Sequence, residues 1–363
     1  MPRVSVIIPS YNHEKYIAET IESVLNQSYQ DFEIVIVDDG SSDKTVDIIS
    51  QFSDERIRLF QLEKNRGASV AANKCVREAK GEFVAMLSSD DIFMHDKLEK
   101  QVAFLEKNTE IAAVFSYAQI VGEDGRNSVG EQNFYQKAFI QPNRTRFEWL
   151  NHFFFYGNCL CHPSVLIRKQ CYGVVGSYDE RFAQLPDLDF WIRLCSKYDI
   201  YVIPENLIKF RVRKHQENAS GNRPEVKIRH MIELSQILKN YLSLENRDNF
   251  SKIFPEAAGS KTGFRNELLP FYIANFALKV NSPSHKYFAI STFYQLFNDT
   301  DIAQKLRSDH SFDFADLIRL SGEYDVFGTI AQEEIERLKH SKFWKIRAQW
   351  LTFKKLLGLT KHD

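Results

Sequence analysis

The sequence predicts an α/β protein: a mainly parallel sheet flanked by helices, with a helical C-terminal extension. Over the first 120 residues, short apolar segments rich in β-branched residues alternate with helical spacings of apolar residues. Strands that are apolar along their whole length and separated by helices are typical of doubly wound parallel sheets, because both faces of such a sheet are buried. From about residue 224 onward the periodicity is helical alone, which predicts the extension.

Five strands are expected in the first part of the chain: Val4–Ile8, Phe32–Val37, Ile57–Phe60, Phe83–Leu87 and Ile111–Ser116. Between them, apolar residues recur at helical spacing after Ile17, Val46 and Leu98. In an open parallel sheet, ligands bind beyond the carboxyl ends of the strands. We therefore expect the binding site in the polar segments at residues 9–12, 38–42 and 88–91.

The remaining chain predicts a mixed segment and then helices. Residues 117–220 have a mixed pattern, with a turn at 123–126 and an aromatic stretch at 147–156. The sequence has no run of about 18 apolar residues, so we expect no transmembrane helix. The expected divisions are an α/β domain, a helical extension and a basic amphipathic C-terminal helix, at residues 1–220, 221–338 and 339–363.

The composition excludes some classes of partner and compartment. The chain has 363 residues, and its 47 Lys and Arg against 48 Asp and Glu give a formal charge of -1 at pH 7. Because nucleic-acid-binding proteins are normally basic, no nucleic-acid partner is expected. The five cysteines are odd in number and irregularly spaced, which favours reduced thiols in the cytosol over a disulfide framework or a zinc site. Since no signal peptide precedes the first strand, we expect a cytoplasmic protein.

Acidic residues follow two of the expected strands. Asp38 and Asp39 precede Gly40 at the end of the second strand, where a carboxylate can accept a hydrogen bond from a nucleobase imide or a ribose hydroxyl. Asp90 and Asp91 follow the fourth strand, and adjacent carboxylates repel each other unless a cation compensates them. Their oxygens suit Mg²⁺ or Mn²⁺ that bridges to phosphate. In both places the alternative is a helix N-cap, which also favours Asp and Ser.

A third acidic pair and a basic cluster lie further along the chain. Asp187 and Asp189 cannot both face one side of a helix or strand. We therefore expect one of them to point at the site and the other to make structural bonds, with Arg193 as a candidate partner. The basic cluster at residues 211–215 could contact a diphosphate or, through its histidine, ligate a metal, although a lone histidine is more often structural.

Together these segments resemble the inverting family 2 glycosyltransferases, which have the Rossmann-like GT-A fold. The resemblance covers the first 220 residues, and the C-terminal 140 carry no comparable motif. It rests on eight motifs in the family's order: VSVIIPSYN at 4–12, EIVIVDDGSS at 33–42, Asn65–Gly67, Ser88–Asp91, His162–Ser164, Gly176–Glu180, Asp187–Leu194 and His215.

The resemblance implies a role for each matched residue. Tyr11 would stack on the nucleobase of the donor, Asp39 would bind its imide, and Arg66 would lie near it. Asp90 would be the principal ligand of Mn²⁺ or Mg²⁺ at the donor diphosphate, and Asp187 would be the general base. The other implied positions are Pro9, Asn12 and Ser89 at the donor nucleotide, Asp91 and His215 at the metal, and His162, Trp191, Arg211 and Arg213 at the acceptor or diphosphate.

Two positions depart from the family pattern. Ser88 stands where the family has the first Asp of its D-x-D motif, and Pro186 stands where it has an acidic residue before the base. We expect the first departure to weaken metal affinity and the second to change the orientation of Asp187.

The resemblance implies transfer of a sugar from a nucleotide-sugar to a hydroxyl of a glycan or lipid-linked acceptor in cell-surface polysaccharide biosynthesis. A UDP-sugar is favoured, with a dTDP-sugar next, because Asp39 suits the imide of uracil or thymine. One alternative is a nucleotidyltransferase that makes sugar nucleotides, but residues 10–13 lack the Gly-rich basic loop that it needs. The other is a non-catalytic relative that acts in binding or assembly, which the presence of Asp90 and Asp187 disfavours.

Two further segments could contact the acceptor or a membrane. Residues 134–158 are rich in aromatics and suit either an acceptor lid that stacks on sugar faces or plain hydrophobic packing. Within 339–359, helical spacing puts five residues on one face among basic residues, which suits the surface of an anionic membrane: Phe343, Ile346, Trp350, Phe353 and Leu357. The protein would then be peripheral on the inner face of the cell membrane, and the alternative is a terminal helix docked on the helical part.

Overall fold

The structure, a computed structural model, describes residues 1–127, 134–213, 218, 220–244, 246–256 and 264–356. The chain divides into two compact units, residues 1–269 and 270–363. The first unit includes α9 (Pro224–Ile237) and α10 (Arg247–Ile253), which lie beyond the residue 220 at which we expected the α/β domain to end.

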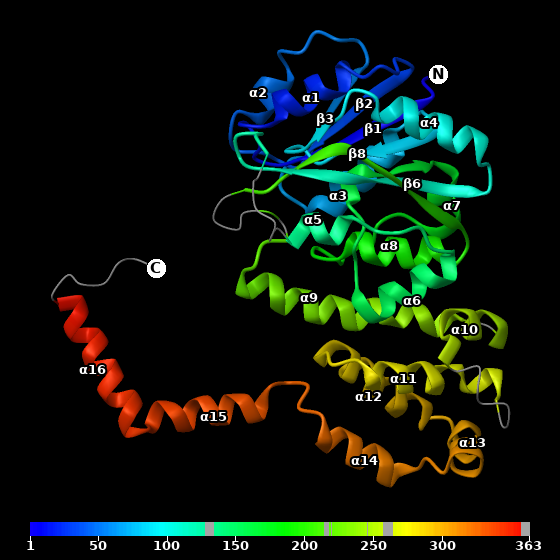
Figure 1. Ribbon diagram of the computed structural model, residues 1–363, viewed down its shortest axis with the longest axis vertical. Coiled ribbons are helices and arrows are strands. Elements are labelled where there is room, and N and C mark those ends of the chain that lie inside the picture. The colour runs from blue at the N-terminus through cyan, green and yellow to red at the C-terminus, as the bar shows by residue number, and fades with distance from the viewer. Residues whose placement is uncertain (128–133, 214–217, 219, 245, 257–263, 357–363) are drawn as a thin grey trace. The chain divides into compact units, whose positions relative to one another are not determined.

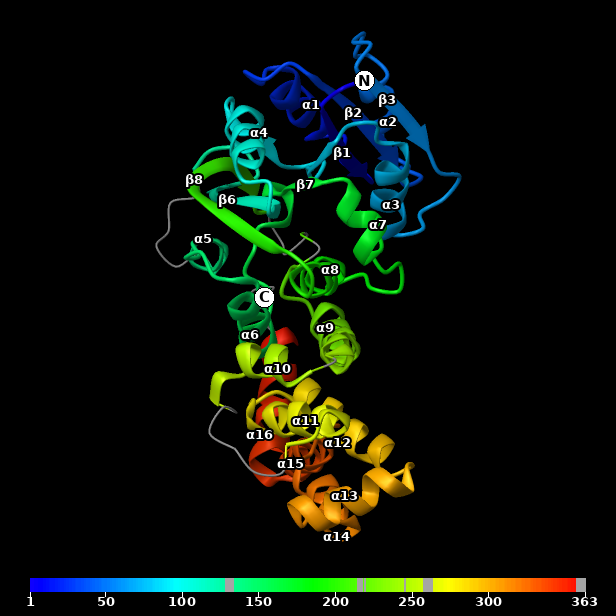
Figure 2. The same ribbon diagram turned by 90° about the vertical axis from the view of Figure 1, so that its right-hand side faces the viewer.

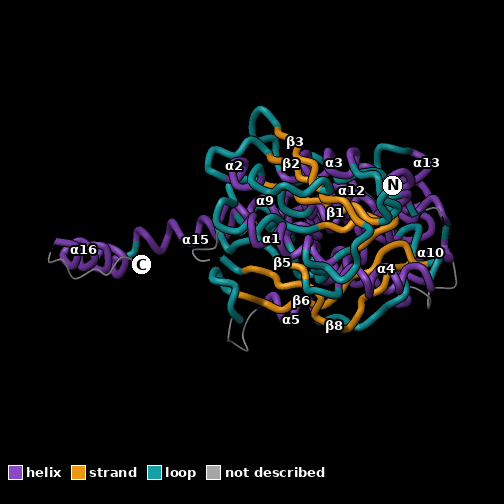
Figure 3. Tube along the Cα trace, turned by 90° about the horizontal axis from the view of Figure 1, so that it is seen from above, coloured by secondary structure: helices purple, strands orange, loops and turns teal. Residues whose placement is uncertain are grey.

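A single sheet forms the centre of the first unit. Among the described residues it has eight strands in the order β3-β2-β1-β4-β7-β6-β8-β5 (Figure 1). Figure 3 shows these strands in series, with β3 and β8 towards opposite ends of the sheet. The strands are β1 (Val4–Ser10), β2 (Phe32–Asp38), β3 (Ile57–Gln61), β4 (Phe83–Met86), β5 (Ile92–Phe93), β6 (Ile111–Val121), β7 (Leu166–Arg168) and β8 (Asp199–Arg211).

The half of the sheet formed by β3, β2, β1 and β4 is parallel, as predicted. Every residue of β2 is buried, because helices cover both faces. Helices α1 (Ile17–Leu25) and α4 (Lys97–Lys107) pack on the face that carries Val4, Val6 and Ile8, and α3 (Ala68–Glu78) lies against the other face (Figure 2). The register pairs Ser10 with Asp38, so the polar segments after β1 and β2 meet at one edge.

The other half of the sheet combines parallel and antiparallel strand pairs. The sequence analysis predicted a mainly parallel sheet and did not identify the antiparallel pairs. β7 is antiparallel to both β4 and β6, and β5 is antiparallel to β8, while β6 and β8 are parallel. An antiparallel strand can join its neighbour without a crossover helix. The short strands β5 and β7 can therefore pair with longer strands.

The remaining helices of the first unit flank the sheet or extend from it. They are α2 (Thr45–Ile49), α5 (Phe134–Phe139), α6 (Arg146–Tyr156), α7 (Gln170–Val175), α8 (Pro186–Cys195), α9 and α10, with 3₁₀ segments at His162–Ser164, Leu238–Ser243 and Asn266–Leu268. The aromatic stretch 147–156 is α6. Thr145 and Glu148 form a capping box at its start, and Trp149, Phe153 and Phe154 on its inner face are buried.

The second unit is helical throughout its described residues. Its helices are α11 (Leu269–Lys279), α12 (Pro283–Leu296), α13 (Thr300–His310), α14 (Phe314–Glu323), α15 (Thr329–His340) and α16 (Lys342–Leu356). In the part of the chain that the structure describes, no helix is both long and apolar enough to cross a bilayer.

The C-terminal basic segment is divided between two helices, because the chain turns at Ser341 between α15 and α16. On α16, the large apolar side chains of Phe343, Ile346 and Trp350 are 78%, 65% and 55% exposed. Leu357, which we expected on the same face, lies outside the described residues.

Candidate active site

The ends of β1 and β2 hold a tight pair of loops. The Asp39 backbone N–H donates to the Ser10 carbonyl at 2.8 Å, and the Asp38 carboxylate accepts both the N–H and the hydroxyl of Ser41. Gly40 has a φ of +73°, and a Cβ there would lie 2.7 Å from the Lys64 backbone. The loop therefore requires glycine at this position on two grounds, its left-handed backbone and its lack of space.

Asp39 fixes a second loop beside the first. Its two carboxylate oxygens accept the backbone N–H groups of Arg66 and Gly67, each at 2.8 Å. The Arg66 side chain is exposed and lines an open pocket of about 530 Å³ with Lys64 and Lys74. Asp39 thus places the basic side chain that the resemblance put near the nucleobase.

Tyr11 and Asn12 follow β1 on the same edge. Tyr11 is 42% exposed, so its ring is free to stack on a ligand. Asn12 has a φ of +51°, and its side-chain oxygen accepts the Ser42 N–H at 2.9 Å. Asn12 therefore holds the β1 and β2 loops together, while Pro9 pairs with Val37 within the sheet.

The two carboxylates after β4 have different surroundings. Asp91 is buried and accepts the backbone N–H of Arg211 at 2.7 Å, and burial together with the neighbouring Asp90 raises its pKa well above the usual value. The Asp90 carboxylate lies 3.4 Å from the guanidinium of Arg213. Asp90 is therefore the carboxylate that is paired with a side chain instead of with the backbone.

His13, which the sequence analysis did not single out, completes this cluster. Its Nε2 lies 2.9 Å from the Arg213 guanidinium and its Nδ1 lies 2.6 Å from the Ser89 hydroxyl. A guanidinium can only donate, so this network assigns the ring proton to Nδ1 and leaves the imidazole neutral. Burial lowers the pKa of His13, which favours the same neutral form. The only signal in the sequence was its position directly after a strand-end loop.

The fit of a divalent metal rests on Asp90. Asp91 is turned towards Arg211, and His215 lies outside the described residues. Within the described ranges, no group of three His, Cys, Asp or Glu side chains could hold a metal. Mg²⁺ and Mn²⁺ are nevertheless often bound by one or two carboxylates together with substrate phosphates. Asp90 fits this arrangement as a single protein ligand.

Arg211 differs from Arg213 although both come from the end of β8. Its guanidinium donates to the carbonyls of Asp90 and Glu123 and pairs with the carboxylate of Glu19 at 2.6 Å, and its side chain is 2% exposed. Arg211 therefore stabilises the loops around β4, and its contact with acceptor or diphosphate stays a prediction.

The third acidic pair opens α8. Pro186 occupies the first turn of this helix, where a missing N–H is harmless, and this accounts for the departure from the family pattern. Asp187 accepts the Leu188 N–H at Oδ1 (2.8 Å) and the side-chain N–H of Asn158 at Oδ2 (2.6 Å). Burial raises the pKa of Asp187 to about 6.

Asp189 makes the structural bonds that we expected of one member of the pair. Its carboxylate accepts Nε and a terminal nitrogen of Arg193 at 2.9 and 2.6 Å, and Asn240 donates to its other oxygen. The loop before α8 is fixed by Glu233, whose carboxylate accepts three consecutive backbone N–H groups, those of residues 183–185, each at 2.8 Å.

Of the two residues that we expected at the acceptor or diphosphate besides the arginines, Trp191 is packed into the core and His162 is half-buried. Trp191 is fully buried and meets the rings of Phe115 and His162 edge-on. His162 Nε2 bonds the Tyr178 hydroxyl at 2.9 Å, and burial lowers its pKa to about 4. A fully buried indole cannot touch a ligand without rearrangement, so Trp191 packs α8, the helix that carries it, against Phe115 of β6.

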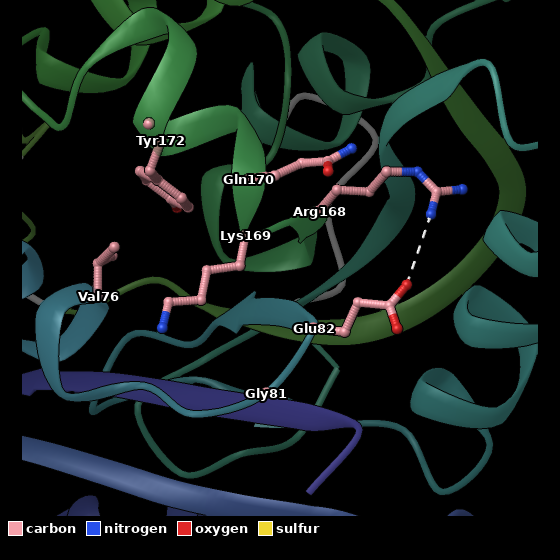
Figure 4. Close-up of a pocket in the computed structure, with 8 residues that line it drawn as sticks. Val76, Gly81, Glu82, Arg168, Lys169, Gln170 and Tyr172 are labelled. Carbon is pink, nitrogen blue, oxygen red and sulfur yellow. Dashed lines mark ion pairs between the residues drawn. The ribbon is translucent and has the colours of Figure 1, made fainter. Parts of the chain in front are cut away.

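Asp91 and Asp187 both act on the Cys161 thiol. Each carboxylate raises the pKa of this thiol, which burial already places well above its usual value. A separate pocket of about 590 Å³ is formed around Gly81, Arg168 and Lys169 (Figure 4). Gly81 precedes the start of β4, so this pocket lies away from the predicted site.

Comparison with known proteins places the chain in a family. Over 258 residues it is 32% identical to an uncharacterized glycosyltransferase of Methanocaldococcus jannaschii, which covers 70% of this chain and 85% of the relative. Residues 5–168 match the model of Glycosyl transferase family 2. The chain belongs to this family. It is also 48% identical over 126 residues to the putative teichuronic acid biosynthesis glycosyltransferase TuaG of Bacillus subtilis, across 34% of this chain and 50% of the relative.

Two solved structures share the fold of this glycosyltransferase at low sequence identity. TarS 1-349 of S. aureus, in complex with UDP-GlcNAc, is 19% identical with a TM-score of 0.58, covering 92% of each chain. The mannosyltransferase PcManGT of Pyrobaculum calidifontis, in complex with GDP-Man and Mn²⁺, is 18% identical with a TM-score of 0.51, covering 90% of this chain and 88% of the other. The predicted GT-A fold and the predicted enzyme class are thereby confirmed.

Proposed function

We propose that this glycosyltransferase transfers a sugar from a nucleotide-sugar to an acceptor hydroxyl by a single displacement with inversion, using Asp187 as the general base. One observation carries the proposal: Asp187 is a half-buried carboxylate, fixed at both oxygens, with a pKa of about 6. A base of this pKa is ionised at neutral pH and still basic enough to accept the proton of a hydroxyl as it attacks.

The donor nucleotide is proposed to lie on the β1 and β2 loops. Tyr11 offers an exposed ring on which the nucleobase can stack. Asp39 holds the backbone of Arg66, whose side chain is proposed to lie beside the nucleobase. Each Asp39 oxygen accepts one backbone N–H and keeps a second lone pair, so the carboxylate can also accept an imide N–H. This favours a UDP-sugar, in keeping with the UDP-GlcNAc in the TarS structure. The mannosyltransferase structure holds GDP-Man, so a guanine donor is the competing choice.

The diphosphate is proposed to bind between Asp90 and Arg213. The Arg213 guanidinium, fixed by His13, is positioned to pair with a phosphate oxygen. A divalent metal held at Asp90 would neutralise charge on the leaving diphosphate. The acceptor hydroxyl then attacks the anomeric carbon from the side of Asp187, the bond to the diphosphate oxygen breaks, and the hydroxyl proton passes to Asp187.

The acceptor is proposed to be a glycan or lipid-linked hydroxyl of a cell-surface polysaccharide. The name of TuaG supports this class of product, and that protein is similar to about a third of this chain. Of the aromatic segment 134–158, the inner residues of α6 are core, while Phe134 and Tyr156 at its ends are 75% and 78% exposed. Among the described aromatic side chains of this segment, these two are the exposed ones, and they are proposed to stack on a sugar.

A test of the base compares two isosteric variants. Asp187→Asn should lower turnover by about 10² to 10⁴-fold while the affinity for UDP, measured by calorimetry, stays within about twofold. Asp301→Asn, a matched change on the first turn of α13, should leave both unchanged. The measurement follows nucleoside diphosphate release from a panel of sugar nucleotides with Mn²⁺ and an acceptor extract. Near-full turnover of Asp187→Asn would contradict the proposed base, and no release from any donor would favour a non-catalytic role.

Nucleotide preference can be measured without an acceptor. We expect UDP with Mn²⁺ to raise the melting temperature more than dTDP, and GDP least, because ligands that bind the native state stabilise it in proportion to their affinity. The largest stabilisation by GDP would refute the assignment of Asp39 to a pyrimidine imide.

Helix α16 is proposed to contact an anionic membrane surface. Its exposed apolar side chains lie among the basic residues Lys342, Arg347 and Lys354. The sequence of α16 contains no acidic residue. Full-length protein should pellet with anionic vesicles at low salt, and a chain that ends at Leu338 should remain in the supernatant. If both remain in the supernatant, α16 has no membrane role.

A further inference from the structure

We propose that Asn158 is a positioning residue for this reaction, which holds the carboxylate of Asp187 in one orientation and in its ionised form. The inference rests on the proposed role of Asp187 as the base. It begins from a contact that the sequence analysis did not anticipate: the Asn158 side-chain nitrogen donates to Asp187 Oδ2 at 2.6 Å, across 29 residues of chain.

The direction of the Asn158 amide is determined by a second bond. The Leu160 backbone N–H donates to the side-chain oxygen of Asn158 at 3.1 Å. Since that oxygen is occupied by a donor, the amide nitrogen must be the end that faces Asp187. A flipped amide would set two N–H groups against each other at Leu160 and two oxygens against each other at Asp187.

The segment that carries Asn158 is itself rigid. Gly157 follows α6 with a φ of +78°, which turns the chain sharply into residues 158–161. Cys159 and Leu160 are buried directly after it. Upstream, α6 is anchored by the fully buried Trp149. Asn158 therefore projects from a fixed loop, and the Asp187 carboxylate is held between this loop and the first turn of its own helix.

The two bonds on Asp187 come from different directions and leave its remaining lone pairs for an acceptor. Oδ1 is fixed by the Leu188 N–H of α8, and Oδ2 is fixed by Asn158. With both oxygens held, the carboxylate cannot rotate about its Cβ–Cγ bond without losing a hydrogen bond. A hydroxyl that approaches Asp187 therefore meets the base in one geometry, which is the condition for efficient proton transfer.

Asn158 also acts on the proton equilibrium of the base. Burial raises the pKa of Asp187, and the bond from Asn158 opposes that rise because it stabilises the ionised carboxylate. Without Asn158, a larger fraction of Asp187 is protonated at neutral pH. The loss of activity then depends on pH, which a purely structural role of Asn158 would not produce.

The test is the pH profile of kcat/KM for Asn158→Ala and Asn158→Asp. For Asn158→Ala, the acid limb should move up by about one to two pH units, with a plateau about tenfold lower. Asn158→Asp keeps an oxygen for the Leu160 N–H but places a second carboxylate against Asp187, so its acid limb should move further up. The dissociation constant of UDP should change less than twofold in both variants.

Asn151→Ala is the matched control. Asn151 is a half-buried residue of α6 whose side chain donates to the Ile253 carbonyl at 2.7 Å. Its loss should lower stability without moving the acid limb. A shift for Asn151→Ala as large as that for Asn158→Ala, or no shift for Asn158→Ala, would overturn the inference.

A double variant separates this inference from the proposed function. If Asn158 acts through Asp187, then Asn158→Ala should add no further loss of turnover in an Asp187→Asn background. Fully additive losses would overturn the positioning role while leaving the base in place. Near-full turnover of Asp187→Asn alone would instead overturn the proposed function, and with it the premise of the inference.

Discussion

Ionisation of Asp187, the proposed base, should lower the free energy of unfolding. The sign of this effect follows from the pKa of Asp187. The pKa of Asp187 is about 6 in the folded chain against 3.8 for an unperturbed carboxyl. Because the folded value is the higher one, the native state binds this proton more tightly than the unfolded state. The contribution of the protonated Asp187 carboxyl to the free energy of unfolding is therefore fully present below pH 3.8, and it is lost as pH rises through 6. A difference of about two pKa units corresponds to about 3 kcal/mol.

Asp187→Asn removes this penalty because its side chain does not ionise. Between pH 5 and pH 7.5 the free energy of unfolding of the unaltered protein should fall relative to that of the variant by about 1 kcal/mol, since part of the loss is already complete at pH 5. The assay is urea unfolding at the two pH values, followed by the fluorescence of Trp149 and Trp191, both buried in the first unit. Parallel changes of the two proteins between these pH values would refute the argument.

Asp189→Asn is the control for that experiment. Its carboxylate is paired with Arg193 inside the protein, so the substitution removes a buried ion pair. It should lower the free energy of unfolding at both pH values, by about 3 kcal/mol. A stabilising effect confined to Asp187→Asn therefore separates the ionisation of the base from a general effect of neutralising an acidic residue on α8.

Four other substitutions test how the site is built. Glu233→Gln keeps a single acceptor for three backbone N–H groups, so it should cost about 1–3 kcal/mol in urea unfolding and should lower turnover, since these groups fix the loop before α8. Gly40→Ala should cost about 1–3 kcal/mol and weaken UDP binding in calorimetry, because the new Cβ would meet the Lys64 backbone. Gly67→Ala has open space around its Cβ, but the φ of +101° at Gly67 strains any side chain, so this substitution should also destabilise the protein. Arg213→Gln should weaken UDP binding about tenfold in the presence of a chelator, and unchanged affinity would exclude Arg213 from the diphosphate site.

The sequence was sufficient for the parallel half of the fold because its strands are long and wholly apolar. Each of the five predicted strands is present, and each begins at the predicted residue. The prediction did not include β5 and β7, which have two and three residues and are too short to show a period. It also missed β8, where Pro204 and Glu205 interrupt the apolar pattern and the register with β6 shifts. Antiparallel pairing in this half depends on contacts that no local pattern records.

The site could be predicted where residues follow a strand or match a family motif. Asp39, Asp90 and Asp187 were predicted in this way, and their roles stay predictions. His13, Asn158 and Glu233 were not predicted, because each acquires its role from a partner that is remote in sequence. The bond from Arg213 to His13 spans 200 residues, so neither residue alone indicates the pair.

The two acidic pairs nearest the proposed chemistry follow one physical rule. In each pair, one carboxylate is held by fixed donors of the protein: Asp91 accepts the Arg211 backbone N–H, and Asp189 binds the Arg193 guanidinium. For Asp91 the donor is uncharged, so burial and the neighbouring Asp90 still raise its pKa well above the usual value. By compensating one member with fixed donors, the fold leaves the other, Asp90 or Asp187, with lone pairs for a ligand. The doubled acidic residues of the sequence therefore have distinct tasks, and replacing the structural member should impair the chemistry only through the geometry of its neighbour.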